Sequence, residues 1–335
     1  MFSPPRCPYP SCPFHAHPVD RFYWRHGAYH PRCRPHPVPR FRCRYCRRSF
    51  SRQSFRADYR HKKPHLNATV LRLMVSCVGL RQAARFLHVA RRTIERRFAW
   101  LARHAAAFHT NRLRGHILRG PFQLDELESF EANRYQPVTV PVLIERRTMF
   151  LVASGVGTLR RKGRLSAHQR RHRAEHERRH GRRPTRSAEA VREVLGRLRP
   201  LLGPSPAFVL ESDHKPSYGR IGRALFGEGF VWHPHSACAR RDRSNPLFPI
   251  NHTHARLRHW LSRLRSRSWC VSKRRAELGR HLAIAALWAN YSRGITNRTR
   301  RTPAAALGIA SRPYRSEELL GWRQDWGPLS PDPEA

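Results

Sequence analysis

Two short cysteine pairs near the N-terminus place the strongest constraint on how this 335-residue chain folds. Cys7 and Cys12 lie in the segment CPYPSC, and Cys43 and Cys46 lie in FRCRYCRRSFS. Four thiolates on two such knuckles form the tetrahedral ligand set that structural zinc requires. In so small a module, metal binding would provide most of the free energy of folding. We therefore expect these four cysteines to bind zinc.

The other cysteines and the nearby histidines leave one ligand position open. One further cysteine and three histidines are alternatives for it: Cys33, His15, His17 and His30. Phe41 before the second knuckle and the Ser-Phe pair after it favour the hairpin of a zinc ribbon. The alternative to a metal site is a set of unrelated reduced thiols. Three cysteines have apolar neighbours, which predicts core positions: Cys77, Cys238 and Cys270.

The charge of the chain indicates a polyanionic partner. Lys and Arg number 66 against 22 Asp and Glu, so the formal net charge is +44. Such an excess repels itself unless it meets a polyanion, and nucleic acid is the commonest one. A genome that prefers Arg codons would explain part of the Arg excess, but not the scarcity of acids. No stretch of eighteen apolar residues and no leader pattern occurs, which predicts a cytoplasmic protein without a membrane span.

Residues 61–110 have the pattern of a helix-turn-helix domain. Apolar residues recur at helical spacing in three segments: Val70, Leu73 and Met74; Ala83, Ala84 and Leu87; Ile94, Phe98 and Leu101. The small alanines of the middle segment allow two helices to cross closely. The outward face of the third helix carries five predicted DNA-binding residues: Arg91, Arg92, Thr93, Arg96 and Arg97. The alternative is a helical hairpin with a solvated basic face.

After residue 119 the pattern changes to that of an α/β unit. Residues 138–157 read as two strands joined by a turn at 145–147, and residues 207–210 read as a further buried strand. The segment between them is polar and basic, and it is either a solvated helical insertion or a phosphate-contacting arm. Strands, an inserted segment, a further strand and then helices form an α/β layout.

Carboxylates stand at strand positions in this unit. The segment FQLDELESFE contains four of them, Asp125, Glu126, Glu128 and Glu131, and a later strand ends in Glu211 and Asp213. Two carboxylates from separate strands can bind magnesium, and the cation offsets their repulsion. Such ions activate a water or a 3′-hydroxyl in phosphodiester transfer. The alternative for Asp125 is a surface salt bridge with a nearby arginine.

The order of these segments resembles the DDE-type insertion-sequence transposases, in particular the group founded by insertion sequence 1. Five stretches carry the resemblance, which covers about residues 7–310: FRCRYCRRSFS, LDELESF, ESDH, RLRSRSWCVSK and TPAAALGI. It implies a ribonuclease-H-like catalytic domain in which Asp125 and Asp213 are catalytic and bind Mg²⁺ or Mn²⁺. It also implies DNA (element ends and target) as partner, a homo-oligomer, and a nucleoid-associated location.

The third acid of that family has no direct counterpart here. The family carries a glutamate near the start of the helix that leads into the segment RLRSRSWCVSK, and the matching position is Asn251. An asparagine oxygen can ligate magnesium, so Asn251 is the predicted third catalytic residue. One alternative is that Asn251 only caps the helix that follows. Another is that Glu277, on a later helix, reaches the site.

The resulting prediction has four parts. A zinc ribbon occupies residues 1–60, a helix-turn-helix 61–110, and an α/β ribonuclease-H-like catalytic domain 115–300, with a basic insertion at 158–200 and a C-terminal tail at 301–335. The expected function is that of a transposase, which binds insertion-sequence ends and catalyses metal-dependent strand cleavage and transfer. The alternatives are a catalytically impaired or domesticated DNA-binding relative and a metal-dependent nuclease.

Overall fold

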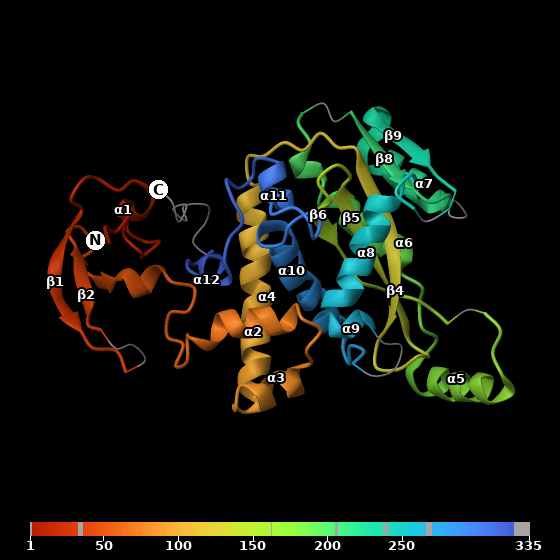
Figure 1. The fold of residues 1–335 in the computed structure, drawn as a ribbon, viewed down its shortest axis with the longest axis horizontal. Helices are drawn as coiled ribbons and strands as arrows, with labels where there is room; N and C mark the ends of the chain where they lie inside the picture. The colour runs from red at the N-terminus through yellow and green to blue at the C-terminus, as the bar shows by residue number, and fades with distance from the viewer. Residues whose placement is uncertain are drawn as a thin grey trace.

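The computed structural model describes residues 2–32, 36–161, 163–204, 207–236, 240, 242–265 and 270–324 (Figure 1). A small N-terminal module with its own sheet, the ribbon module (residues 2–60), lies at one end of the molecule. The α/β body (residues 114–306) contains a larger mixed sheet, and three helices lie between the two parts.

The ribbon module is a three-stranded antiparallel sheet built around aromatic residues and cysteines. Its elements are α1 (Pro13–Ala16), β1 (Tyr23–Tyr29), β2 (Val38–Cys43), β3 (Ser49–Ser51) and the 3₁₀ turn η1 (Arg52–Phe55). The strands lie in the order β1-β2-β3, and Phe41 pairs with Phe50 across the β2–β3 hairpin. The hairpin predicted around the second knuckle is therefore present. Its core is separate from that of the rest of the chain.

The helix-turn-helix segment comprises α2 (Leu66–Met74), α3 (Leu80–Phe86) and α4 (Arg91–Leu113). Seven of the predicted apolar positions are buried, namely Val70, Met74, Ala83, Ala84, Ile94, Phe98 and Leu101, whereas Leu73 and Leu87 are only partly buried. Although α4 has 23 residues, neither it nor any other helix of the described ranges is long and apolar enough to cross a membrane.

The helix-turn-helix does not have a core of its own. One hydrophobic cluster runs from Leu71 of α2 through Phe98 of α4 to Tyr291 at the end of α10 (Arg275–Tyr291). The length of α4 explains this, because α4 packs along α10 and continues to Leu113, past the predicted domain limit at 110 (Figure 1). The segment and the α/β body are therefore expected to unfold together.

The larger sheet has six strands. They are β4 (Phe122–Phe130), β5 (Pro137–Glu145), β6 (Phe150–Ser154), β7 (Gly157–Thr158), β8 (Phe208–Ser212) and β9 (Phe230–Pro234). The order is β6-β5-β4-β8-β9, and β7 pairs with β5. β5 is antiparallel to β4 and β6, whereas β4, β8 and β9 are parallel. Parallel neighbours need long crossovers, and helices fill both of them.

Helices cover both faces of this sheet. The crossovers contain α5 (Ala167–His180), α6 (Ser187–Gly196), η2 (Arg199–Leu201), α7 (Pro216–Phe226) and η3 (Gly227–Gly229). α6 and α7 pack on one face, and α8 (Phe248–Trp260), α9 (Ser262–Arg265) and α10 pack on the other. Gly222 lets α7 approach β9 closely, because a Cβ there would lie 2.1 Å from the Phe230 ring.

The predicted basic insertion at 158–200 is only partly an insertion. α5 has no buried residue and projects from the body (Figure 1). α6, in contrast, buries Val191, Val194 and Leu195 in the core. The apolar stripe of α6 covers the sheet face beside β5, so this half of the segment belongs to the fold.

Within the predicted C-terminal tail at 301–335, residues 302–324 pack against the rest of the chain. This segment contains α11 (Pro303–Ala306) and α12 (Ser316–Leu319), and Tyr314 and Leu319 are buried. The Trp322 ring lies 6.2 Å from that of Phe2 and packs in the aromatic core of the ribbon module. Apolar residues spaced along the segment find partners on the helix-turn-helix and the ribbon module. The final stretch GPLSPDPEA lies outside the described residues.

A buried histidine joins the helix-turn-helix to the body and makes stability depend on pH. The His281 Nε2 atom lies 2.8 Å from the Met74 carbonyl oxygen, and the His281 ring packs edge-on against Phe98. Burial lowers the pKa of His281 from 6.5 to about 4. The unfolded chain therefore takes up a proton near pH 6.5 that the folded protein excludes, so stability is complete above pH 6.5 and is lost as the pH falls towards 4.

We expect His281→Gln to reduce this acid sensitivity. Glutamine can still donate an N–H to the Met74 carbonyl but does not titrate. In the wild type, His281 should lower the free energy of unfolding by at most about 3 kcal/mol between pH 6.5 and pH 4. The melting temperature of both proteins should be measured from pH 7.5 to pH 4.5. An equal fall in the two proteins would show that His281 does not carry the effect.

Candidate functional sites

The four predicted zinc ligands converge in the ribbon module. The sulfur atoms of Cys7 and Cys46 are 3.7 Å apart, those of Cys12 and Cys43 are 3.8 Å apart, and all four lie within 4.8 Å of one another. A tetrahedron of sulfurs around zinc at 2.3 Å has edges of about 3.8 Å. The chain can therefore bind a metal ion such as zinc at this cluster.

The alternative ligands do not join this cluster. His15 Nδ1 lies 2.8 Å from the Cys7 carbonyl oxygen, so His15 buttresses the knuckle rather than completing it. Neither His17 nor His30 belongs to the one metal-binding group of three or more residues found in the described ranges. Cys33 and Cys238 lie outside those ranges. Cys270, predicted to be a core residue, is exposed, because it precedes α10 at the rim of a hollow.

Without a cation, three thiols of the four-cysteine cluster have perturbed pKa values. Burial raises the pKa of Cys7 and of Cys12. Burial acts in the same direction on Cys43, but hydrogen bonds from the backbone amides of Cys46 and Tyr45 outweigh it and lower the pKa of Cys43. Buried thiolates that crowd together repel each other, and a divalent cation removes this repulsion.

The predicted DNA-binding face of α4 is smaller than the sequence indicates. Arg92 and Arg96 are exposed, and exposed Arg91 forms an ion pair of 2.7 Å with Glu95. Thr93 is half-buried. Arg97 is also half-buried, and Asp58 acts on it electrostatically. The reason is that the linker carrying Asp58 packs beside α4, so Arg97 faces that linker. Arg91, Arg92 and Arg96 remain as the exposed cations of this face.

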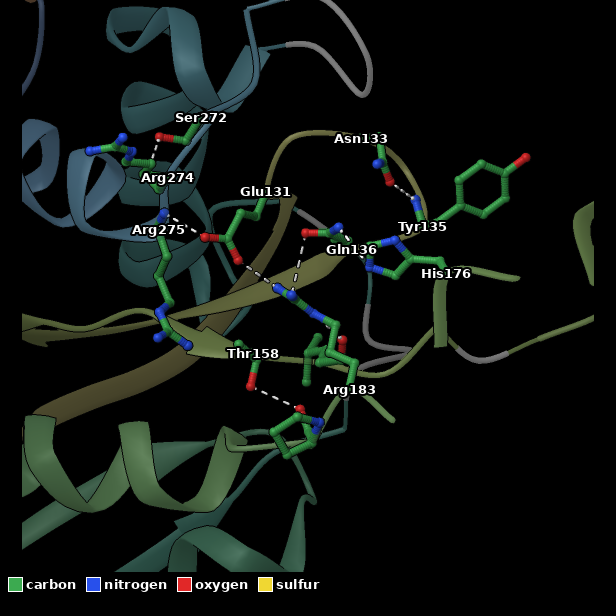
Figure 2. A network of polar contacts seen from close by, with 12 residues as sticks. Glu131, Asn133, Tyr135, Gln136, Thr158, His176, Arg183, Ser272, Arg274 and Arg275 are labelled. Atoms are coloured by element: carbon green, nitrogen blue, oxygen red, sulfur yellow. Dashed lines mark hydrogen bonds and ion pairs between the residues drawn. The ribbon is translucent and has the colours of Figure 1, made fainter. Parts of the chain in front are cut away.

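The four carboxylates of β4 and its end have four different environments. Asp125 faces α8, and its neighbour Glu126 faces the opposite side of the sheet, towards α6 and α7. Glu128 is exposed. Glu131 accepts hydrogen bonds from Arg183 and from the backbone amide of Arg275, both at 2.8 Å (Figure 2). Alternation along the strand turns Asp125 and Glu126 to opposite sides, but Asp125, Glu126 and Glu128 still line one hollow, whereas Glu131 does not.

Asp125 and Asp213 come together from neighbouring parallel strands. β4 pairs with β8 in a register that sets Gln123 opposite Glu211, and Asp213 follows the end of β8. Both aspartates line one hollow of about 450 Å³. Burial raises the pKa of Asp125 to about 6, a hydrogen bond from the Glu126 amide opposes this, and the charge of Asp213 raises the pKa further. A carboxylate whose proton affinity is raised by a neighbouring carboxylate is a candidate ligand for a cation.

His254 on α8 lies beside Asp125, and the sequence interpretation missed it. It does not line the hollow that contains the two aspartates. Its Nδ1 atom lies 3.4 Å from Asp125 Oδ2, and its Nε2 atom is buried without a hydrogen-bond partner. Burial lowers the pKa of His254 to about 3, with a smaller contribution from Arg258, so the imidazole is neutral. A neutral imidazole beside a carboxylate can ligate a divalent cation. This geometry does not support the surface salt bridge considered for Asp125.

Asn251 lies one helical turn before His254 on the same helix. No contact joins its side chain to Asp125 or Asp213 in the ranges that the structure describes. α8 begins at Phe248, with Leu247 in the capping position, so the prediction that Asn251 caps this helix is wrong. Glu277 forms an ion pair with Arg280 and lines a different hollow. The signal for His254 was its position three residues after Asn251, because residues i and i+3 share a helix face.

A polar network beside the two aspartates joins β4 to the loop that carries Asp213, and its residues line the same hollow. Glu126 accepts hydrogen bonds from Thr139 Oγ1 at 2.8 Å, Ser187 Oγ at 2.7 Å, Tyr218 Oη at 3.0 Å and Lys215 Nζ. The backbone amide of Lys215 donates to Asp213 Oδ1 at 3.2 Å. Lys215 therefore ties the loop that carries Asp213 to the residue next to Asp125. With its lone pairs occupied in this way, Glu126 is a structural group.

No protein-family model matches this chain, and no curated protein matches its sequence.

Proposed function

We propose that this protein is a DNA transposase whose chemistry takes place at Asp125, Asp213 and His254, in a ribonuclease-H-like domain. The observation that carries the proposal is the pair of aspartates, from neighbouring parallel strands, that lines one hollow. His254 lies against Asp125, with its Nδ1 atom 3.4 Å from the carboxylate. The mixed sheet with helices on both faces is compatible with that domain. The net charge of +44 and the basic start of α4 support DNA as substrate.

The donor set fits a divalent cation. Two carboxylates would supply oxygen ligands, and the neutral imidazole of His254, whose Nδ1 atom faces Asp125, would supply a nitrogen ligand. Bound here, Mg²⁺ or Mn²⁺ would supply Lewis-acid activation of a water or a DNA 3′-hydroxyl and would stabilise the leaving oxygen.

The protein's own groups position the substrate. Arg160 and Arg161 line the hollow with the two aspartates, so a phosphodiester entering it meets positive charge. Arg160 is itself oriented by a two-point ion pair with Glu177 of α5. Lys215 and Glu126, which also line the hollow, join β4 to the Asp213 loop by hydrogen bonds. A geometry that is held before the substrate arrives is what strand cleavage needs.

The test is a cleavage and joining assay on DNA that spans the two boundaries of the protein's own coding segment. With Mg²⁺ or Mn²⁺ we expect nicks at defined positions near these boundaries and products in which a cut end is joined to target DNA. DNA binding without cleavage in either metal would indicate the non-catalytic DNA-binding relative instead. Hydrolytic cleavage without any joined product would indicate a nuclease.

Two substitutions on α8 test which residue is the third ligand of the proposed cation. We expect His254→Ala to lower the cleavage rate about 100-fold, because it removes the group nearest to Asp125. Asn251→Ala should stay within about threefold of wild type, since Asn251 remains only a sequence-based prediction for this role. Wild type should reach half-maximal rate at a lower Mn²⁺ than Mg²⁺ concentration, and His254→Glu should narrow that difference. The reverse ranking of the two alanine variants would assign the role to Asn251.

A further inference from the structure

A second and larger hollow lies between the helix-turn-helix and the α/β body. Its volume is about 1690 Å³. α3 and the start of α4 form one wall, and α9, residues 270–274 and the start of α10 form the other. We call this hollow the interhelix groove. It is distinct from the hollow that contains Asp125 and Asp213, since the two share no lining residue.

The interhelix groove is strongly cationic. Seven arginines and lysines line it, and its two glutamates are each neutralised, Glu95 by Arg91 and Glu277 by Arg280. Five cations remain that have no salt-bridge partner in the described part of the chain: Arg81, Arg85, Arg263, Lys273 and Arg274. All but Arg263 are exposed, so their charge is available to a ligand.

The turn between β4 and β5 connects the interhelix groove with the acidic hollow. Lys273 Nζ donates to the Ala132 carbonyl at 3.4 Å, and the Arg275 amide donates to Glu131 at 2.8 Å, so the groove wall rests on this turn (Figure 2). On the other side of the turn, Arg161 of the acidic hollow donates to the Arg134 carbonyl at 3.1 Å. Basic groups therefore flank the turn on both sides.

The distance between the interhelix groove and the two aspartates suits duplex DNA. Asp125 and Phe130 are five residues apart on one strand, which corresponds to about 17 Å at 3.3–3.4 Å per residue. That is roughly five base pairs of rise at 3.4 Å each. A duplex whose phosphates contact Lys273 and Arg274 would thus reach the aspartates within less than one turn of its helix.

We propose that the interhelix groove binds the DNA backbone and leads a duplex from α4 to the acidic hollow. This rests on the proposed function for the choice of DNA. The charge of the groove indicates DNA as its ligand, because arginines and lysines without salt-bridge partners bind phosphates. A second copy of this chain is disfavoured as occupant, since it also carries a net charge of +44.

The experiment compares charge reversal inside and outside the interhelix groove. The groove variants are Arg81→Glu with Arg85→Glu, and Lys273→Glu with Arg274→Glu. The control, Arg298→Glu with Arg300→Glu, changes two exposed arginines far along the chain by the same charge. Binding to a duplex from the coding-segment boundary is measured between 50 and 300 mM salt. Glutamine versions of each pair, checked by circular dichroism and melting, guard against misfolding.

Each groove pair should make the slope of log K against log salt less steep by about two, because two phosphate contacts are lost. The control pair should change this slope by less than one. Groove variants that match the control would overturn the groove proposal, whatever the wild type does in cleavage assays. A wild type that does not cleave, with groove variants that bind with the reduced slope, would overturn the proposed transposase and leave the groove proposal standing.

Discussion

Replacing Asp125 or Asp213 with asparagine is expected to lower the rate of DNA cleavage at least about 100-fold while DNA binding stays within about twofold. Each change removes a charge from the pair that lines one hollow, and an amide is a weaker ligand for a divalent cation. The measurement is the single-turnover cleavage rate at saturating DNA. Filter binding or fluorescence anisotropy on the same DNA reports the affinity.

Asp125→Asn should also make the folded protein more stable. Burial and the neighbouring carboxylate raise the pKa of Asp125 from 3.8 to about 6. An acid with a raised folded-state pKa opposes folding once it is charged, so its cost grows between pH 3.8 and pH 6 and is complete at neutral pH. Removing that charge at pH 7 without divalent metal should raise the free energy of unfolding by roughly 2 kcal/mol.

Glu228→Gln is the control for Asp125→Asn. Glu228 is exposed and does not line the hollow, so its change should alter neither the cleavage rate nor the melting temperature appreciably. If Asp125→Asn cleaves DNA as fast as wild type, chemistry at this hollow is excluded. If Asp125→Asn is also less stable than wild type, the carboxylate is a structural group and not a strained cation site.

Removing the metal from the ribbon module should unfold that module and leave the α/β body folded. The cysteines and the aromatic residues around them form a separate core, and zinc binding in small domains of this kind is worth about 10–16 kcal/mol. We expect one zinc per chain by atomic absorption. After chelation, or in Cys43→Ser, residues 2–60 should become sensitive to protease while the helices of the body keep their circular dichroism.

Tryptophan fluorescence provides a second readout of the ribbon module. Trp322 packs against Phe2 and Phe55, so loss of the module should shift its emission to longer wavelength. Cys77→Ser is the control, because Cys77 lies on the helix-turn-helix and outside the four-cysteine cluster. A chelated protein that contains no metal and yet resists protease in residues 2–60 would contradict a metal-dependent ribbon module.

Short-range patterns in the sequence predicted the local structure well. The spacing of Cys7, Cys12, Cys43 and Cys46 predicted their convergence, because a knuckle confines its two thiols to a small region whatever surrounds it. Helical and alternating periodicity predicted α2 to α4, β4, β5, β6 and β8, since each element buries one face or both. These features depend on residues that are neighbours along the chain.

Long-range packing decided the remainder. Whether α6 and the segment 302–324 are solvated or buried depends on which surfaces of the body remain to be covered, and no local pattern contains that information. The register of β4 against β8 brings Asp125 and Asp213 to the same hollow. The pitch of α8 brings His254, one turn after Asn251, against Asp125. The proposed chemistry depends on contacts between residues about 40 to 130 positions apart, and only a packed tertiary structure specifies them.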